Sequence, residues 1–445
     1  MWRADRERLR SLVVALAAAA VAVTCSRESR LEPLTPAAKK APPAPSAAPK
    51  AKPAAPSAAS SLPVIPSAAK AAPGAPADAL VLERFDAALA ALEAKTRKGP
   101  VRILWLGDSH TSADFMTGAL RRKLSQRFGP GGPGFVRVGA SPYRHEGVKL
   151  VREGRWKVEP EPPSRRTTDG DTALGFAGMR WIPADARARL EARVDSRAVS
   201  GTVRYELVFD LPHGASFKLR IGKNEHLIDG RTTLEHVPGS PLSRLHLEGA
   251  PSDGFEVGSM SGGPRFYGVF AEGSEPGLVL DTSGIDGARV ATALAWNAEV
   301  LAAELRARPP DLLAVAYGTN EAFDNRRAEI IGNDVTELVT RLRRGAPNAD
   351  CLVVGPPDAA APDLTSLPHV VEIEDALHVA ATRLGCGFFA LRVAMGGDGA
   401  FVRWMREVPA LARGDRIHLM PAGYERLGEG VADALIAGFE YRRKN

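Results

Sequence analysis

A short apolar run that ends in Gly107-Asp108-Ser109 sets the strongest limit on the fold. Residues 101–106 read Val-Arg-Ile-Leu-Trp-Leu, with one polar residue among them. A run this short, followed directly by glycine, predicts a strand buried on both faces, as in a parallel sheet covered by helices. Ser109 then falls just past the carboxyl end of that strand, where open parallel sheets bind their ligands. A serine there can equally cap the next helix, so its role depends on partners elsewhere in the chain.

Strands and helices alternate after about residue 274, which predicts a doubly wound parallel sheet. A helix through Leu82 and Leu92, capped by Asp78, precedes the first strand. Strands are expected at 277–280, 311–316, 351–354 and 387–391, and helices at 288–307, 327–344, 370–384 and 422–439.

The period of the apolar residues changes from helical to alternating between residues 149 and 273. Residues 203–209 and 217–221 alternate on either side of Pro212-His213-Gly214, which predicts a hairpin. Shorter runs of the same kind follow at 244–247, 255–257 and 265–270. We therefore predict an all-β domain of the jelly-roll or sandwich type at 149–273, inserted into an α/β domain formed by 78–148 and 274–445.

The first 77 residues predict export rather than a folded domain. Residues 1–25 combine a basic start with an apolar run and Cys25, which is typical of a secretory signal peptide. Ala22-Val23-Thr24-Cys25 resembles a bacterial lipobox, which would make Cys25 a lipid anchor; an uncleaved membrane anchor is the alternative. Residues 26–77 are rich in Ala, Pro, Ser and Lys, and we expect a disordered linker. The expected location is the periplasm or the membrane surface of a bacterial cell envelope.

The net positive charge of the chain comes from these first 77 residues. Of the formal net charge of +6, residues 1–77 contribute +7, which leaves −1 for residues 78–445. The folded part therefore gives no reason to expect nucleic acid as a partner, whereas the linker could lie on anionic peptidoglycan or on a membrane.

The cysteines do not suggest a metal site. Besides Cys25, only Cys351 and Cys386 occur, each inside an apolar strand-like run. We interpret them as small buried apolar residues, with a disulfide as the alternative. No Cys or His pair has the spacing of a structural zinc site.

Polar residues follow each later strand and could complete a site around Ser109. Gly287 comes after the second strand, Asn320 after the third, and Asp415 and His418 stand near the end of the chain. The three-residue spacing of Asp415 and His418 lets a carboxylate hold one imidazole nitrogen while the other faces a serine. A turn, a helix cap and a surface loop are the ordinary explanations of these residues.

Together these residues resemble the SGNH hydrolase superfamily, also called GDSL-type esterases, over residues 100–135 and 265–430. The sequence is most similar to the bacterial peptidoglycan O-acetylesterases, which also have a β insert similar to a carbohydrate-binding module. Gly132-Pro-Gly-Phe135 and Met395-Gly-Gly397 are further likenesses. The four blocks are Gly107-Asp-Ser-His-Thr111, Gly284-Ile-Asp-Gly-Ala288, Gly318-Thr-Asn-Glu321 and Asp415-Arg-Ile-His418.

The resemblance implies a flavodoxin-like three-layer α/β fold and a role for each block. Ser109 would be the nucleophile, His418 its general base and Asp415 the acid that orients the histidine. The Ser109 amide, the Gly287 amide and the Asn320 side chain would form the oxyanion hole, and no cofactor or metal is implied. Two residues depart from the family pattern: Asp286 replaces a frequent Asn, and Glu321 replaces a frequent Asp.

The expected function is a serine esterase that removes O-acetyl groups from peptidoglycan or another envelope glycan. An O-acetyltransferase using the same serine is one alternative, and a non-catalytic wall-binding lipoprotein is another. Trp156, Trp181 and Tyr205 of the β insert could stack on sugar, although core packing is the commoner use of such residues. The sequence leaves the oligomeric state open.

Overall fold

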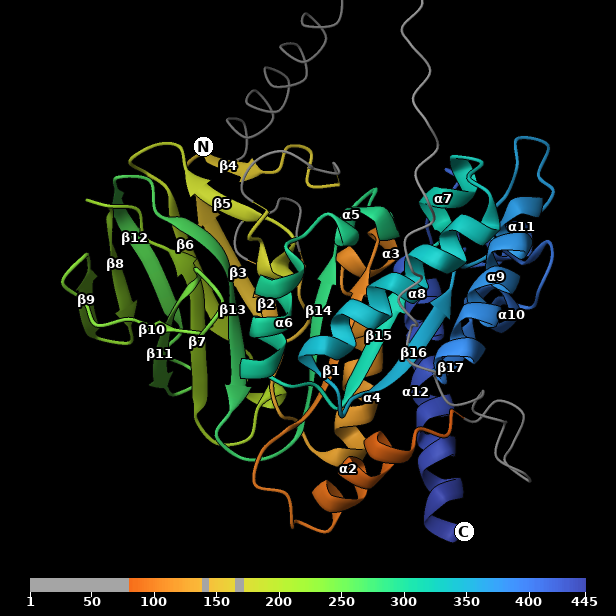
Figure 1. The fold of residues 1–445 in the computed structure, drawn as a ribbon, viewed down its shortest axis with the longest axis horizontal. Helices are drawn as coiled ribbons and strands as arrows, with labels where there is room; N and C mark the ends of the chain where they lie inside the picture. Colours follow the sequence, from red (N-terminus) through yellow and green to blue (C-terminus); the bar gives the residue numbers. More distant parts are fainter. Residues whose placement is uncertain (1–79, 138–143, 165–171) are drawn as a thin grey trace, which may run out of the picture. The chain divides into compact units, whose positions relative to one another are not determined.

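The computed structural model describes residues 80–137, 144–164 and 172–445. The predicted signal peptide 1–25, Cys25, the linker 26–77 and Asp78 lie outside the described residues. The centre of the fold is a five-stranded sheet in the order β14-β1-β15-β16-β17, in which all neighbours are parallel (Figure 1). This confirms the predicted parallel sheet and gives it the strand order of flavodoxin-like folds. The strands are β1 (Val101–Gly107), β14 (Leu278–Gly284), β15 (Leu312–Ala316), β16 (Asp350–Gly355) and β17 (Gly387–Ala390).

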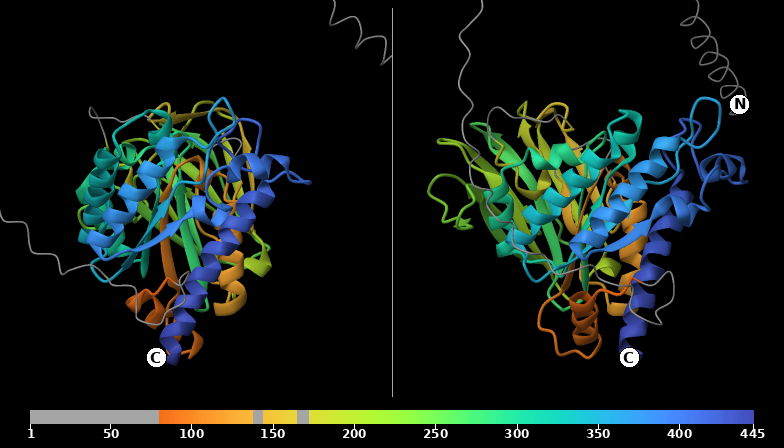
Figure 2. Two further views of the ribbon diagram at one scale, coloured as in Figure 1. Left: turned by 90° about the vertical axis from the view of Figure 1, so that its right-hand side faces the viewer. Right: turned by 45° about the vertical axis from the view of Figure 1, so that its right-hand side comes forward.

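Helices cover both faces of this sheet because its strands are apolar on both sides. Leu104 and Leu106 of β1 pack into one hydrophobic cluster, and Ile103 and Trp105 pack into another on the opposite face. Figure 2 shows α12 lying along α4 on the second face. The helices of the first face are α5 (Val290–Leu294), α6 (Ala298–Ala307), α8 (Ala328–Gly345) and α9 (Pro368–Leu384); those of the second are α2 (Glu83–Glu93), α4 (Met116–Phe128), α10 (Leu391–Met395), α11 (Ala400–Arg406) and α12 (Pro421–Lys444).

The helix expected at 288–307 is wrong as a single element, because it is two helices. The side chain of Asn297 caps α6 by accepting hydrogen bonds from Glu299 N and Val300 N at 3.1 and 3.0 Å. The first amides of a helix have no acceptor within that helix. Asn297 accepts hydrogen bonds from two of them, so a new helix starts here.

Two antiparallel sheets lie beside the α/β part, and their facing apolar side chains form a third hydrophobic cluster. The pairing begins earlier than residue 149, because β2 (Gly134–Arg137) pairs with β13 (Arg265–Gly273). The seven-stranded sheet also contains β4 (Trp156–Glu159), β5 (Arg180–Pro183), β7 (Val203–Asp210), β10 (Glu235–His236) and β11 (Ser243–Gly249). The five-stranded sheet contains β3 (Val148–Glu153), β6 (Arg189–Val194), β8 (Ser216–Ile221), β9 (Asn224–Ile228) and β12 (Phe255–Ser261).

The hairpin expected from residues 203–209 and 217–221 is wrong. β7 pairs with β11 and β13 in one sheet, whereas β8 pairs with β9 and β12 in the other. The two strands face each other across the core, with the rings of Phe209 and Phe217 centred 5.1 Å apart. Alternation shows that each strand has one apolar face, but it does not show whether the two strands pair or face each other.

Buried charged residues join the seven-stranded sheet to the α/β part. Glu272 of β13 accepts hydrogen bonds from Arg102 of β1 at 2.9 Å and forms an ion pair with Arg308, which also binds Asp281 of β14 at 3.2 Å. Burial works to raise the pKa of Glu272, but the guanidinium groups of Arg308 and Arg102 outweigh it and lower that pKa to about 2. These charges can stay buried because each has an opposite partner.

Cys351 of β16 and Cys386, just before β17, form a disulfide. Our interpretation of both as free apolar residues is therefore wrong, and the alternative holds. The parallel pairing of β16 with β17 brings the two cysteines together, since Leu352 is the partner of Gly387. Within the described part of the chain, none of the helices has the length and apolar character needed to span a membrane.

Candidate active site

Ser109 begins a short helix, α3 (Ser109–Ser112), directly after β1. Asp108 caps this helix by accepting a hydrogen bond from His110 N at 3.0 Å. Gly107 permits the tight turn, because a Cβ there would lie 2.9 Å from the carbonyl oxygen of Ala316 on β15. The serine therefore sits at the carboxyl end of the sheet on a turn that requires glycine.

His418 and Asp415 lie next to Ser109 although they come from the far end of the chain. The Ser109 hydroxyl is 2.9 Å from Nε2 of His418, and Nδ1 of His418 is 3.0 Å from Oδ2 of Asp415. The other Asp415 oxygen accepts hydrogen bonds from the amides of Ile417 and His418 at 3.0 and 2.8 Å. Burial works to raise the pKa of Asp415, but these amide hydrogen bonds outweigh it and lower that pKa. The carboxylate is thus held ionised behind the imidazole.

Gly287 and Asn320 follow the two strands that flank β1. Gly287 follows β14, and Asn320 is in α7 (Thr319–Phe323), which follows β15. The two segments touch, since Nδ2 of Asn320 donates to the carbonyl oxygen of Ala288 at 2.9 Å. An amide nitrogen carries two hydrogens, so the second remains for another acceptor. The order β14-β1-β15 explains why residues so distant in sequence meet at one edge of the sheet.

Sequence reasoning missed the contacts that lock these two segments together. Arg289 donates to the carbonyl oxygen of Gly287 at 2.8 Å and to Oδ1 of Asp324, next to α7, at 2.6 Å. Oε1 of Glu321 accepts from Val290 N at 2.8 Å. Glu321, which departs from the family pattern, therefore has a positioning contact. The other departure, Asp286, accepts a hydrogen bond from the hydroxyl of Ser112 in α3.

His110 is a second histidine beside His418 that sequence reasoning did not assign. The two rings are centred 5.6 Å apart, and Nδ1 of His110 is 3.0 Å from the hydroxyl of Tyr424 on α12. Burial, together with the nearby His418, lowers the pKa of His110 to about 3. His110 is therefore neutral at physiological pH and adds no positive charge next to His418.

Two carboxyl groups are buried beneath the Ser109 turn. Burial raises the pKa of Asp108 to about 7, and the neighbouring carboxylates of Glu321 and Asp286 add to this effect. Burial likewise raises the pKa of Glu321. Among the described residues, no cluster of three or more His, Cys, Asp or Glu side chains is arranged to hold a metal ion.

The segment around Ser164, which follows β4, lies against the residues near Gly287. The carbonyl oxygen of Ser164 accepts a hydrogen bond from Thr292 Oγ1 at 3.0 Å, and a Cβ on Gly287 would lie 3.4 Å from the Ser164 hydroxyl. Two of the three aromatic residues considered for sugar stacking are buried, Tyr205 with an exposure of 1% and Trp181 with 8%. Core packing, the commoner use of such residues, is therefore confirmed for both, and stacking on sugar is wrong for them.

Comparison with known proteins identifies a family for part of the chain. Residues 252–426 match the model of the GDSL-like lipase/acylhydrolase family. This region is a GDSL-like acylhydrolase domain. The chain is accordingly a serine esterase. The matched range includes Gly287, Asn320, Asp415 and His418, whereas Ser109 precedes it, on the other side of the β insert.

One solved structure shows the same fold over most of the chain. The structure of a peptidoglycan O-acetylesterase is similar over 80% of this chain and 96% of that chain, with 23% identity and a TM-score of 0.67. A carbohydrate esterase of family 3 from Talaromyces cellulolyticus covers 36% of this chain and 72% of its own, with 15% identity and a TM-score of 0.27. The acetyl xylan esterase AlAXEase covers 36% and 81%, with 15% identity and a TM-score of 0.28. No curated protein matches the sequence.

Proposed function

We propose that this GDSL-like acylhydrolase removes O-acetyl groups from peptidoglycan or another cell-envelope glycan, with Ser109 as the nucleophile. The observation that carries the proposal is the hydrogen-bonded series from Ser109 through His418 to Asp415 at the carboxyl end of the sheet. A serine hydroxyl is a weak nucleophile until a base removes its proton, and the His418 nitrogen lies within reach of that proton.

The acylation half of the reaction follows from this arrangement. As the Ser109 oxygen attacks the acetyl carbonyl carbon, its proton passes to Nε2 of His418, and Asp415 stabilises the resulting imidazolium. The carbonyl oxygen becomes an oxyanion, which the amides of Ser109 and Gly287 and the second hydrogen of Asn320 Nδ2 would bind. His418 then gives the proton to the sugar oxygen, the ester bond breaks and the deacetylated hydroxyl leaves.

Deacylation repeats these roles with water. The water oxygen attacks the carbonyl carbon of the acetyl-serine while His418 takes a proton from that water. The proton then passes to the Ser109 oxygen as acetate departs. The same acetyl-serine could pass its acetyl group to a sugar hydroxyl, which is the transferase alternative. A non-catalytic wall-binding role is less well supported, because Ser109, His418 and Asp415 keep contacts that binding alone does not need.

The glycan substrate is supported by the extent of the fold similarity. The similarity to the peptidoglycan O-acetylesterase covers 80% of this chain. The α/β part alone makes up a smaller fraction of the chain, so the similarity includes the β insert. We keep the prediction that this insert is a jelly-roll or sandwich module that contacts the glycan. Its Ser164 segment lies against the residues near Gly287, where a glycan bound at the site would pass.

We also propose an envelope location, with Cys25 as a lipid anchor and residues 26–77 as a tether to the wall or membrane. The Cys351–Cys386 disulfide supports export, because disulfides persist in oxidising compartments. Membrane fractionation of the wild type and of Cys25→Ala tests the anchor. An unchanged distribution after the substitution would exclude it.

Acetate release tests the main proposal. Purified protein is incubated with acetylated peptidoglycan, acetylated xylan and a small acetyl ester, and Ser109→Ala is expected to abolish turnover on all of them. Ser216→Ala, which changes a serine of β8 in the insert, is the matched control and should retain wild-type rates. Wild-type acetate release by Ser109→Ala, or none by the wild type on any ester, would refute the hydrolase assignment and favour transfer or binding.

A further inference from the structure

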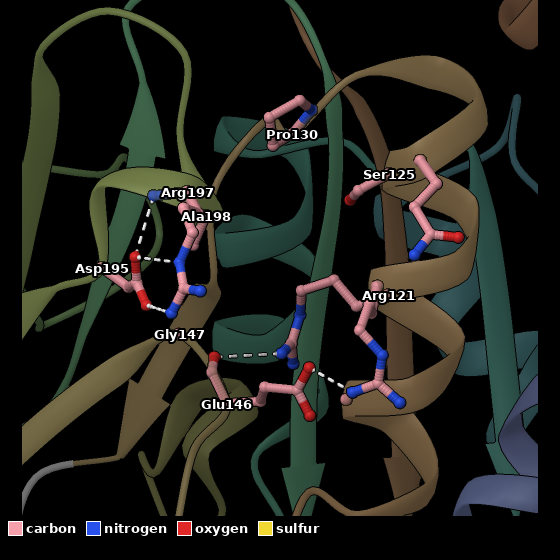
Figure 3. A pocket seen from close by; sticks show the side chains of 11 residues that line it. Arg121, Ser125, Pro130, Glu146, Gly147, Asp195, Arg197 and Ala198 are labelled. Carbon is pink, nitrogen blue, oxygen red and sulfur yellow. Dashed lines mark hydrogen bonds and ion pairs between the residues drawn. The ribbon is translucent and has the colours of Figure 1, made fainter.

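A cavity lies along α4, outside the candidate active site. Its volume is about 460 Å³, within the range of cavities that hold small ligands. One wall is α4, and the other consists of Pro130, Glu146, Gly147 and the turn η2 (Ser196–Ala198) with its neighbour Asp195 (Figure 3). We call it the α4 groove. None of Ser109, Gly287, Asn320, Asp415 and His418 lines it.

Arg121 of α4 is a buried cation in the wall of this groove. Its exposure is 6%, and its terminal nitrogens bind Asp114 at 2.9 and 3.0 Å and the carbonyl oxygen of Glu146 at 3.3 Å. Figure 3 shows the side chain reaching from α4 toward Glu146. Within the described parts of the chain, its Nε has no hydrogen-bond partner. The two bonds to Asp114 fix the Arg121 side chain in the wall, so ligand contacts fall to the more exposed groups of the groove.

Two further guanidinium groups line the groove and remain accessible. The side chains of Arg122 and Arg197 are 39% and 88% exposed, and they bind Glu146 and Asp195 at 2.5 and 2.7 Å. With the partners that these groups bind, the ion pairs of the groove comprise four arginines and three carboxylates, an excess of one positive charge: Arg121 with Asp114, Arg122 and Arg144 with Glu146, and Arg197 with Asp195. Ser125 and Gln126 add a hydroxyl and an amide. This set suits a ligand with several hydroxyl groups and one carboxylate.

The groove leads away from the candidate active site along α4. From Gly118 to Gln126 it extends about 12 Å, at 1.5 Å per helical residue. Arg144 binds Glu146 at 3.2 Å, and its guanidinium lies 4.5 Å from the centre of the Phe115 ring. Phe115 in turn stacks on Tyr424, the partner of His110. Contiguous side chains therefore connect the groove to the surroundings of Ser109.

We propose that the α4 groove binds a carboxylate-bearing sugar unit of the glycan chain whose ester is cleaved at Ser109. This proposal rests on the proposed function, because it assigns the groove to the same polymer. The carboxylate is bound by Arg122 and Arg197, and the hydroxyls by Ser125 and Gln126. A phosphate group, with nearly two negative charges, fits a single excess positive charge less well.

Kinetics on the full-length enzyme separate this role from catalysis. The double variant Arg122→Gln with Arg197→Gln should raise KM for acetylated peptidoglycan about tenfold, which corresponds to the loss of one charged hydrogen bond. Its kcat on the polymer and its activity on a small acetyl ester should not change. Arg231→Gln is the matched control, because Arg231 is 85% exposed and binds Asp229 two residues earlier, as Arg197 binds Asp195, but lies outside the groove.

Calorimetric titration decides the ligand class independently of turnover. Ser109→Ala is titrated with N-acetylmuramic acid, which carries a carboxylate, and with N-acetylglucosamine, which does not. Tighter binding of the acid, lost in the double arginine variant, is the expected result. An unchanged polymer KM in the double variant, or no arginine-dependent binding of the acid, would overturn the proposal. If the wild type cleaves no ester, the proposed function fails, and the titration still decides whether the groove binds the sugar.

Discussion

Arg289 and Asp324 join the two segments that carry the proposed oxyanion donors. Nη2 of Arg289 lies 2.6 Å from Oδ1 of Asp324, and Nη1 of the same guanidinium binds the carbonyl oxygen of Gly287 at 2.8 Å. One planar group thus fixes the turn at Gly287 relative to α7, which contains Asn320. A lysine keeps the charge but cannot make both contacts with one rigid fork.

Arg289→Lys should therefore lower kcat by about tenfold to a hundredfold, because small displacements of catalytic groups have effects of this size. KM for a small ester should change much less. Arg265→Lys is the control, since Arg265 forms an ion pair of similar exposure with Asp210 in the β insert, at 3.0 Å. A double-mutant cycle of Arg289→Ala and Asp324→Ala should show non-additive losses in kcat. Additive losses would mean that the two residues act separately.

Asn320 and Asn297 allow binding of the oxyanion to be distinguished from helix capping. Asn320→Ala should lower kcat by about 10² to 10³, the usual effect of removing one oxyanion donor. It should also cost about 1 kcal/mol in stability, because the hydrogen bond to Ala288 is lost. Asn297→Ala provides the comparison for kcat. It removes the cap of α6 and should cost about 1 kcal/mol in stability without a change in kcat. Steady-state kinetics and urea unfolding of both variants give the comparison, and equal effects on kcat would contradict the proposed role of Asn320.

The central sheet could be predicted from the sequence because each of its strands is a short, isolated apolar run. Residues 101–106 illustrate this, since Gly99-Pro100 precede them and Gly107-Asp108 follow them. The parallel arrangement then follows from the helices between the strands. The parallel arrangement also predicts that Ser109, Gly287 and Asn320 gather at one edge of the sheet. The structure places them after the adjacent strands β1, β14 and β15.

The remaining features depend on contacts that no local pattern encodes. The alternation at Phe209 and Phe217 is the same whether two strands pair or face each other. The pair Arg289–Asp324 joins single charged residues 35 positions apart, and nothing in either neighbourhood marks a partner. The α4 groove could not be predicted for the same reason. Arg122 and Arg197 come from separate elements, and only the packing of the insert brings them together.

Asp108 should make stability depend on pH near neutrality. Its pKa in the folded protein is raised by burial from an ordinary value of 3.8 to about 7. Between these values the folded state holds a proton that the unfolded chain has lost, so this contribution is complete below pH 4 and is lost as the pH rises through 7. From pH 5 to pH 8 the loss is on the order of 2 kcal/mol.

Urea unfolding of the wild type and Asp108→Asn at pH 5 and pH 8 measures this contribution. The variant, which cannot ionise at this position, should lose less stability over the interval. Asp86→Asn offers a second test, because burial raises the pKa of Asp86 to about 7 as well. If the wild type and both variants lose equal stability, the two carboxyl groups do not titrate in this range.

The ion pairs of Glu272 should contribute to stability in a way that exposed pairs do not. Glu272 is 7% exposed and binds Arg102 of β1, so it connects the insert to the central sheet. Glu272→Gln leaves buried guanidinium groups without a full opposite charge, and we expect a loss of about 3 to 5 kcal/mol at pH 7. Glu225→Gln, in an exposed pair with Lys218, should cost less than about 1 kcal/mol.

The sign of the pH dependence provides a further check on Glu272. Its pKa is lowered to about 2 in the folded protein from an ordinary value of 4.5, so its contribution is present above pH 4.5 and is lost as the pH falls toward 2. The difference in unfolding free energy between wild type and Glu272→Gln should therefore shrink between pH 5 and pH 3. A difference that stays constant over this range would show that the variant acts through altered packing rather than through the lost charge.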